Sequence, residues 1–124
     1  MTIQGIHHVQ ITVPPGAEEV ARHFYGEVLG LVEIAKPAPL AARGGFWLAV
    51  GDRQVHVGIE SGVDRAATKA HIAYQVDDLA AWRERLTQAG IAITESVPIS
   101  GFSRLECRDP FGNRIEFIQP LPVA

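Results

Sequence analysis

Residues 6–13, IHHVQITV, alternate polar and apolar side chains and are followed by Pro14, Pro15 and Gly16. Such alternation is typical of a β-strand with one buried face, because successive side chains point to opposite faces of a sheet. A second segment, KAHIAYQV at residues 69–76, repeats the pattern, and a helical sequence follows each of the two segments. The fold is therefore expected to contain one structural motif twice.

The two halves of the chain have the same predicted order of elements, β-α-β-β-β. In both halves apolar side chains recur at helical spacing after the first strand, and a glycine, Gly30 or Gly90, ends the helix. Asp77 or Asp78 is the predicted cap of the second helix. The predicted helix of the first half spans residues 17–30, with Ala17, Val20, Phe24 and Val28 on its apolar face. It is followed by a strand at 31–35, a loop at 36–45 and strands at 46–50 and 54–59. The second half has a predicted helix at 79–89 and strands at 91–96, 103–108 and 114–118.

The two halves are expected to form one domain. One small sheet with one helix cannot enclose a core, so the halves should pack side by side as a single α+β domain. We assign the modules to residues 1–60 and 69–120 of one domain spanning residues 1–124. The segment DPFGN, residues 109–113, joins the last two strands, and its Asp, Pro and Gly fit a type I turn.

Charge and composition exclude several classes of function. The net charge of -3 and the scattered positions of the 11 Lys and Arg residues give no basic surface for nucleic acid or an anionic membrane. No apolar run approaches the roughly 18 residues of a membrane span, and the lone Cys107 cannot form an internal disulfide. Because the first residues do not resemble a secretion signal, we expect a cytoplasmic protein with a small-molecule partner.

Potential metal ligands fall on one face of four predicted strands. In the first strand His7 shares its face with the apolar residues, whereas His8 lies on the opposite face, and His71 occupies the equivalent position in the second half. The last strands of the two halves place His56 and Glu116 at equivalent positions of that same face. On a single strand a polar face is usually solvent-exposed, but ligand types that recur in all four strands favour a metal site.

Charged side chains are expected beside Glu116 on the face of the second sheet that borders a binding cavity. Arg104 and Glu106 share its face in the preceding strand, and Arg114 lies on the same strand as Glu116. The two arginines are candidates to bind a carboxylate, phosphate or enolate of a substrate. Alternatively, they pair with Glu106 across the strands or reach solvent at the rim.

The first sheet offers two further candidates for contact with a substrate. Trp47 is expected to face the cavity while Phe46 and Leu48 pack inward, and it would then form a flat apolar wall; an ordinary core tryptophan is the alternative. Gln54 shares the face of His56 and is therefore also expected to line the cavity.

Four segments of the chain resemble the vicinal oxygen chelate superfamily of glyoxalases, fosfomycin and bleomycin resistance proteins, and ring-cleaving dioxygenases. They are HHVQITV, FYGEVLGL, HIAYQVDDL and DPFGNRIEF, of which the last is the most specific. The resemblance implies paired βαβββ modules whose curved mixed sheets form an open, barrel-like cavity around one divalent metal ion. It also implies that His8, His71 and Glu116 are the metal ligands.

The chain departs from the glyoxalase branch at His56, where the resemblance would place a glutamate. The remaining set of two histidines and one carboxylate can hold divalent iron, manganese, zinc or nickel and leave coordination sites open for a substrate. His56 is then a fourth ligand, a catalytic acid or base that acts together with Glu116, or a pocket-lining histidine held by a hydrogen bond to a neighbour.

The resemblance implies a metal-dependent enzyme, of the lyase, isomerase or dioxygenase type, that acts on a small oxygen-rich substrate which chelates the metal. It leaves open a non-catalytic protein of the bleomycin-resistance type that binds an antibiotic or another small molecule. Metal content distinguishes these two alternatives. Proteins of this size that resemble the superfamily commonly form homodimers, so a homodimer is expected.

Overall fold

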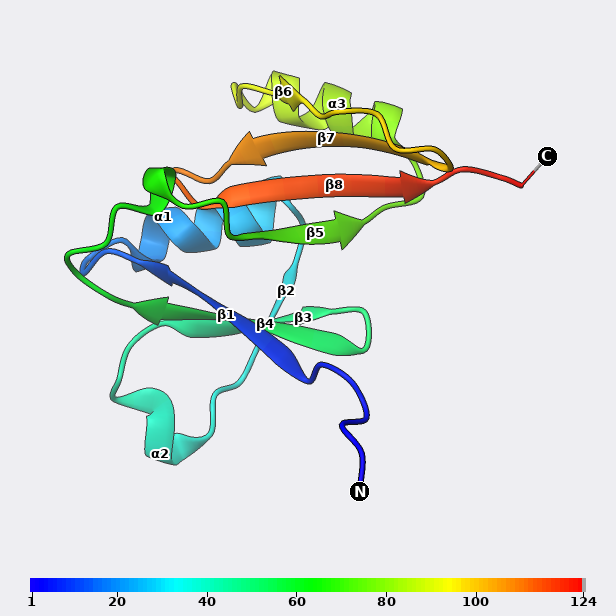
Figure 1. Cartoon of the computed structure of the whole chain (residues 1–124). Coiled ribbons are helices and arrows are strands. Elements are labelled where there is room, and N and C mark those ends of the chain that lie inside the picture. Colours follow the sequence, from blue (N-terminus) through cyan, green and yellow to red (C-terminus); the bar gives the residue numbers. More distant parts are fainter. Residues whose placement is uncertain (124) are drawn as a thin grey trace. The chain divides into compact units, whose positions relative to one another are not determined.

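The computed structural model describes residues 1–123 of the chain (Figure 1). The chain divides into two compact units, which we call unit 1, Met1–Val63, and unit 2, which begins at Asp64. Each unit holds one four-stranded mixed sheet and one main helical segment. No helix among the described residues is long and apolar enough to cross a lipid bilayer.

Unit 1 contains a sheet with the strand order β1-β4-β3-β2. β1 is parallel to β4 and the other neighbouring strands are antiparallel, so the first and last strands of the unit lie side by side. The elements are β1 (His8–Val13), α1 (Glu18–Arg22), the π-helix η1 (His23–Val28), β2 (Val32–Ile34), α2 (Ala38–Ala41), β3 (Phe46–Val50) and β4 (Arg53–Ile59).

Unit 2 repeats this topology. Its sheet has the order β5-β8-β7-β6, with β5 parallel to β8 and the other pairs antiparallel. The predicted repeat of β-α-β-β-β in an α+β fold is therefore confirmed. The elements are the 3-10 helix η2 (Arg65–Ala67), β5 (His71–Gln75), α3 (Leu79–Gln88), β6 (Thr94–Glu95), β7 (Phe102–Arg108) and β8 (Arg114–Pro120).

One face of each sheet is apolar and buried. In unit 1 the guanidinium of Arg22 on α1 lies 4.9 Å above the ring of Phe46, and in unit 2 Trp82 of α3 stacks on Phe117. Burial of a large apolar side chain such as Phe46 or Phe117 stabilises the folded state by about 1.5–3 kcal/mol. The predicted alternation is confirmed, because side chains of one parity are at most 4% exposed: Phe46, Leu48, Val55 and Val57 in unit 1, and Leu105, Cys107, Ile115 and Phe117 in unit 2.

The helical segment of unit 1 widens after its first turns. In η1 the N–H of Leu29 donates to the carbonyl of Phe24 at 2.9 Å, a span of five residues. The buried side chains along the segment are Ala21, Phe24, Tyr25 and Leu29. The predicted apolar face is confirmed at Phe24 and wrong at Val20, which is 52% exposed because α1 buries Ala21 instead.

Four strands are shorter than the sequence predicts: β1, β2, β5 and β6. The first strand begins at His8 instead of residue 6, and its first paired position is His8 with Gln54 of β4. The strand predicted at 91–96 is reduced to the two residues of β6, which pair only with two residues of β7.

The segment predicted as a loop at 36–45 contains the helix α2. Pro37 is the N-cap of α2, and Pro39 lies in its first turn. The fixed φ of proline suits these positions. A helix-start signal was therefore present in the sequence, although the Pro and Gly content of the segment favoured a loop.

The turn between β7 and β8 sets the register of the last two strands. The N–H of Gly112 donates to the carbonyl of Asp109 at 3.1 Å, which confirms the predicted four-residue turn. The carboxylate of Asp109 accepts two backbone N–H groups of the turn and the side-chain amide of Asn113. As a result, Glu106 lies directly opposite Glu116 in the ladder.

Gly45 precedes β3 at a position where the backbone requires glycine. Its φ is +78°, and a Cβ there would lie 2.1 Å from the carbonyl oxygen of Val57. We predict that Gly45→Ala lowers the free energy of unfolding by about 3 kcal/mol, because strain of about 1–2 kcal/mol from the positive φ adds to a steric clash of similar size. Urea denaturation measures this loss.

Gly51, in the turn between β3 and β4, is the matched control. Its φ is +55°, but a Cβ there meets nothing within 4 Å. Gly51→Ala is therefore expected to lower the free energy of unfolding only by the backbone strain of the positive φ, about 1–2 kcal/mol. Equal losses in the two variants would contradict the steric explanation.

Candidate functional site

Parallel pairing of β1 with β4 brings His8 and His56 together in unit 1. His8 is opposite Gln54, and His56 lies two residues further along β4, on the same face. The two imidazole rings stack with their centroids 4.1 Å apart. Trp47, opposite His56 on β3, stacks on the other side of the His56 ring at 3.8 Å. Three rings from three neighbouring strands thus form one stack, and the central ring is 5% exposed.

The surroundings of His56 favour its neutral form. Its Nε2 lies 2.9 Å from the side-chain oxygen of Gln54, which can only accept a hydrogen bond. Burial lowers the pKa of His56 below its ordinary value, and the positive charges of His8, His7 and Lys36 lower it further. The ring therefore carries its proton on Nε2 and keeps a lone pair on Nδ1.

His8 keeps one ring nitrogen available. Its Nδ1 lies 3.0 Å from Nδ1 of His7, whereas its Nε2 makes no hydrogen bond with any of residues 1–123. The sequence placed His7 on the helix-facing side of the first strand. The structure corrects this, because His7 precedes the strand, is exposed, and has its ring against that of His8.

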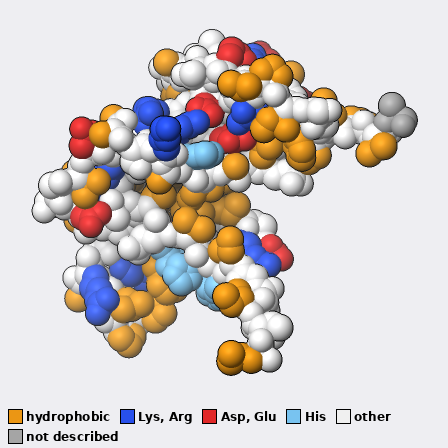
Figure 2. All heavy atoms as spheres, in the orientation of Figure 1, with side chains coloured by type: hydrophobic (Ala, Val, Ile, Leu, Met, Phe, Trp, Pro, Cys, Tyr) orange, Lys and Arg blue, Asp and Glu red, His pale blue; other side chains and the backbone are white. Residues whose placement is uncertain are grey.

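A pocket of about 430 Å³ opens beside the three-ring stack in unit 1. Figure 2 shows histidine side chains gathered over β1 and β4, with Lys and Arg side chains over the α2 segment. Residues 36–45 were predicted as a loop, so their place in the lining could not be predicted from the sequence. The lining residues are His8, Gln10, Lys36, Leu40, Arg43, Gly44, Trp47, His56, Val57, Gly58 and Ile59.

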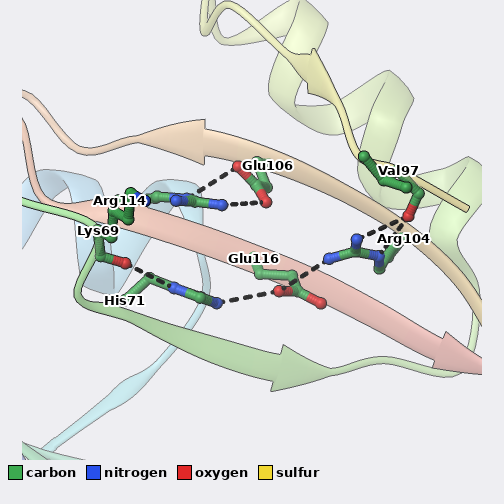
Figure 3. Close-up of polar contacts among 7 residues, drawn as sticks. All are labelled: Lys69, His71, Val97, Arg104, Glu106, Arg114 and Glu116. Carbon is green, nitrogen blue, oxygen red and sulfur yellow. Dashed lines mark hydrogen bonds and ion pairs between the residues drawn. The ribbon is translucent and has the colours of Figure 1, made fainter. Parts of the chain in front are cut away.

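Unit 2 repeats the register of unit 1 with different side chains (Figure 3). His71 is opposite Arg114, and Glu116 lies two residues further along β8, on the same face. His71 and Glu116 therefore occupy the positions that His8 and His56 occupy in unit 1, as the repeat in the sequence predicted. Nε2 of His71 is 3.1 Å from Oε1 of Glu116, whose side chain is buried.

The hydrogen bonds of His71 point to a positive charge beside Glu116. Nδ1 of His71 donates to the carbonyl of Lys69 at 3.0 Å, since a carbonyl oxygen only accepts. In a neutral ring Nε2 would then present a lone pair to the carboxylate of Glu116, which also only accepts. A proton between the two groups, carried by the ring or by the carboxyl, or a bound cation makes this contact favourable.

The two arginines of the unit 2 face have different partners. Arg114 pairs with Glu106, one of the alternatives that the sequence left open, whereas Arg104 lies beside Glu116. Arg114 donates from Nε and Nη2 to Glu106 at 2.9 and 2.7 Å, and these bonds hold the pKa of Glu106 below its usual value. Arg104 donates to the carbonyl of Val97 at 3.0 and 2.6 Å and places Nη1 3.4 Å from Glu116. The face is thus an ordered network of charges (Figure 3).

Each unit brings together two of the four predicted metal-binding side chains. Within either unit, no three described His, Cys, Asp or Glu side chains gather around one point. The available donor atoms are imidazole nitrogens and one buried carboxylate, which suit a divalent transition metal. The ligand set of His8, His71 and Glu116, with or without His56, stays a prediction.

Comparison with known proteins identifies the family. A family model described as the Glyoxalase/Bleomycin resistance protein/Dioxygenase superfamily matches residues 5–117. The chain belongs to this superfamily. A solved structure of a glyoxalase family protein from Bacillus anthracis is 41% identical to this chain and has a TM-score of 0.90. The match covers 97% of this chain and 98% of that one. No curated protein matches the chain.

More distant structures of glyoxalase-like fold show how far the fold extends. A glyoxalase/dioxygenase from Nostoc punctiforme is 20% identical with a TM-score of 0.77, over 96% of this chain and 92% of that one. An antibiotic binding protein from Streptomyces sp. CB03234 is 22% identical with a TM-score of 0.70, over 97% and 98% of the two chains. At such identities the likeness concerns the fold alone. The superfamily includes enzymes and non-catalytic binders, and its members usually bind a divalent metal.

The lowered pKa of His56 predicts a pH dependence of stability. Because the folded state binds the proton of this ring less readily than the unfolded state, the contribution of His56 is fully present above the unfolded value of 6.5. It is lost as the pH falls through the lowered pKa of the folded state. We predict that His56→Phe, which keeps an aromatic ring in the stack, weakens the dependence of unfolding free energy on pH below 6.5.

The measurement is urea denaturation of chelator-treated protein across the acid range. His23→Gln is the control, because the side chain of His23 is largely exposed and lies outside the stack. In this control the unfolding free energy should depend on pH as steeply as in the unaltered protein. If His56→Phe also keeps that slope, His56 does not titrate as the structure predicts.

Proposed function

We propose that this protein is a metal-dependent enzyme of the glyoxalase type, which acts on a small, oxygen-rich substrate that chelates a divalent metal ion. The proposed ligands are His8, His71 and Glu116. The observation that carries the proposal is the 3.1 Å contact of Nε2 of His71 with Glu116, made by a ring whose other nitrogen is bonded to the carbonyl of Lys69.

The surroundings of these ligands support the proposal. Metal-binding histidines usually donate their second nitrogen to a carbonyl or carboxylate, which fixes the ring and directs the lone pair at the metal. The carbonyl of Lys69 fulfils this role for His71. His8 offers a free Nε2 and would complete the set, either from the same chain or from a second copy.

The bound metal would act as a Lewis acid that stabilises negative charge developing on substrate oxygen atoms. Two histidines and one carboxylate suit iron, manganese, zinc or nickel. The chain itself supplies groups that move protons. Nδ1 of neutral His56 is a candidate base, and Glu116 is the second proposed catalytic group. Proton transfer by these groups is what a lyase or isomerase needs, whereas a dioxygenase needs iron as the metal.

The remaining site residues take different proposed roles in the two units. In unit 1 the ring of Trp47 and the amide of Gln54 are proposed to contact the substrate, since both share the face of His56. In unit 2 Arg104, Glu106 and Arg114 are proposed to bind the substrate at the edge of their network; Arg104 also orients Glu116 through the 3.4 Å contact.

A second candidate function is small-molecule binding without catalysis, of the bleomycin-resistance type. Two observations favour it. The ion pairs of unit 2 satisfy Glu106 and Glu116 without a metal, and the three-ring stack of unit 1 presents aromatic surface to a pocket. In this case a proton, and not a metal ion, joins Nε2 of His71 to Oε1 of Glu116.

We further propose a cytoplasmic homodimer whose modules span residues 1–60 and 69–120. The dimer rests on the resemblance to the superfamily. Sedimentation equilibrium of the purified protein tests the dimer directly.

Metal content tests the proposed function. We predict that protein purified without chelator carries about one divalent ion per chain, because three ligands make one site. His8→Ala, His71→Ala and Glu116→Ala should each lower metal affinity by more than the about 10–100-fold that loss of an outer partner costs. Elemental analysis and a competitive chelator titration measure both quantities.

His23→Ala is the matched control, since it removes a largely exposed histidine outside the proposed ligand set. It should leave the metal content unchanged. Protein that holds no divalent ion, and binds none on addition, would refute the proposed enzyme and leave the binding protein as the function.

A further inference from the structure

The pocket of unit 1 has two distinct walls. The β-sheet side presents the edge of the three-ring stack, and the opposite side is formed by the segment around α2. Leu40, Trp47, Val57 and Ile59 give the pocket apolar surface. At about 430 Å³ it has room for a small organic molecule.

The charged residues of this pocket are all of one sign. Of the described residues that line it, Lys36 and Arg43 are cations and none is Asp or Glu. Glu18 approaches the same segment, but its carboxylate accepts the N–H of Gly45 at 3.0 Å and is not part of the lining. The pocket therefore combines apolar walls with two uncompensated positive charges.

Lys36 precedes the helix α2 and Arg43 follows it, so the two cations flank this helix within the segment of residues 36–44. Nζ of Lys36 donates to the carbonyl of Gly44, so one hydrogen bond links the beginning of the segment to its end. Nζ of Lys36 retains two further N–H donors, and the guanidinium of Arg43 makes no hydrogen bond or ion pair within residues 1–123. Both cations can thus donate to a bound ligand.

We propose that this pocket binds a small organic anion, in which a carboxylate, phosphate or phosphonate bound by Lys36 and Arg43 is attached to an apolar or planar body that lies against Trp47 and Leu40. The identification of this anion with the substrate rests on the proposed function, because His8 lines the same pocket. The binding of the anion itself does not require the metal.

The physical basis is charge complementarity in a partly enclosed space. Hydrogen bonds between a cation and an anion are stronger than neutral ones, and the apolar walls reduce competition from water. Because the pocket is open to solvent, added salt should weaken the binding. A neutral molecule of the same shape would gain only the apolar contact.

The test uses the full chain, freed of metal by a chelator, and three probes. Benzoate and phenylphosphonate carry the two anionic groups, and benzyl alcohol is the neutral analogue. We expect both anions to shift the backbone amide resonances of Gly44 and Gly58 in a saturable way, whereas benzyl alcohol at the same concentrations does not. Binding of only one of the two anions still supports the proposal and identifies the anionic group.

Charge-neutralising variants locate the site. Lys36→Gln and Arg43→Gln should each weaken the binding of the anions about tenfold, as expected for loss of one charged hydrogen bond. Arg53→Gln is the matched control, because Arg53 is an exposed cation of unit 1 outside this pocket. It should change the affinity less than twofold. Arg43→Lys keeps the charge and should restore most of the affinity.

Three results would overturn the proposal: no saturable shift with either anion, equal affinity for benzyl alcohol, or an Arg53→Gln variant that loses as much affinity as Arg43→Gln. Because the titration uses metal-free protein, it separates the two proposals. A chain that binds anions but no metal contradicts the proposed enzyme alone. A chain that binds metal but neither anion contradicts the anion pocket alone.

Discussion

Parallel pairing of the first and last strands in each unit is the constraint on which the rest of the site depends. In the linear chain His8 and His56 are separated by most of unit 1, and His71 and Glu116 by most of unit 2. The parallel ladder places each pair two residues apart in register on one face. Since a slip by one residue would turn every side chain to the opposite face, this register fixes both the buried core and the polar site.

The two sheets use one geometry for two kinds of chemistry. Trp47 in unit 1 and Glu106 in unit 2 hold equivalent positions, each directly opposite the functional residue of the last strand. The aromatic side chain stacks on the ring of His56, whereas the acid forms an ion pair with Arg114. Unit 1 therefore offers a pocket for an organic ligand, and unit 2 offers a charged centre around Glu116.

Protonation links these features to the proposed reaction. A catalytic base has to be neutral and accessible at one atom near the working pH, and the contact of His56 with Gln54 leaves Nδ1 as that atom. The His71 ring is oriented differently, since its Nδ1 is engaged by a backbone carbonyl and its Nε2 faces a carboxylate. His56 and His71 thus differ in which ring nitrogen is engaged.

The sequence by itself determined the repeat, the strand faces and the four ligand-type residues, because alternation with a period of two is a local property of a strand. It also determined the turn at Asp109, where the side chain and backbone of five consecutive residues suffice. Only the tertiary structure decided what each polar residue contacts. Whether Arg114 pairs with Glu106, whether α2 forms and lines a pocket, and which helix face is buried all depend on partners that no local pattern specifies. No local pattern encodes those partners, since they are brought together by strand register and packing.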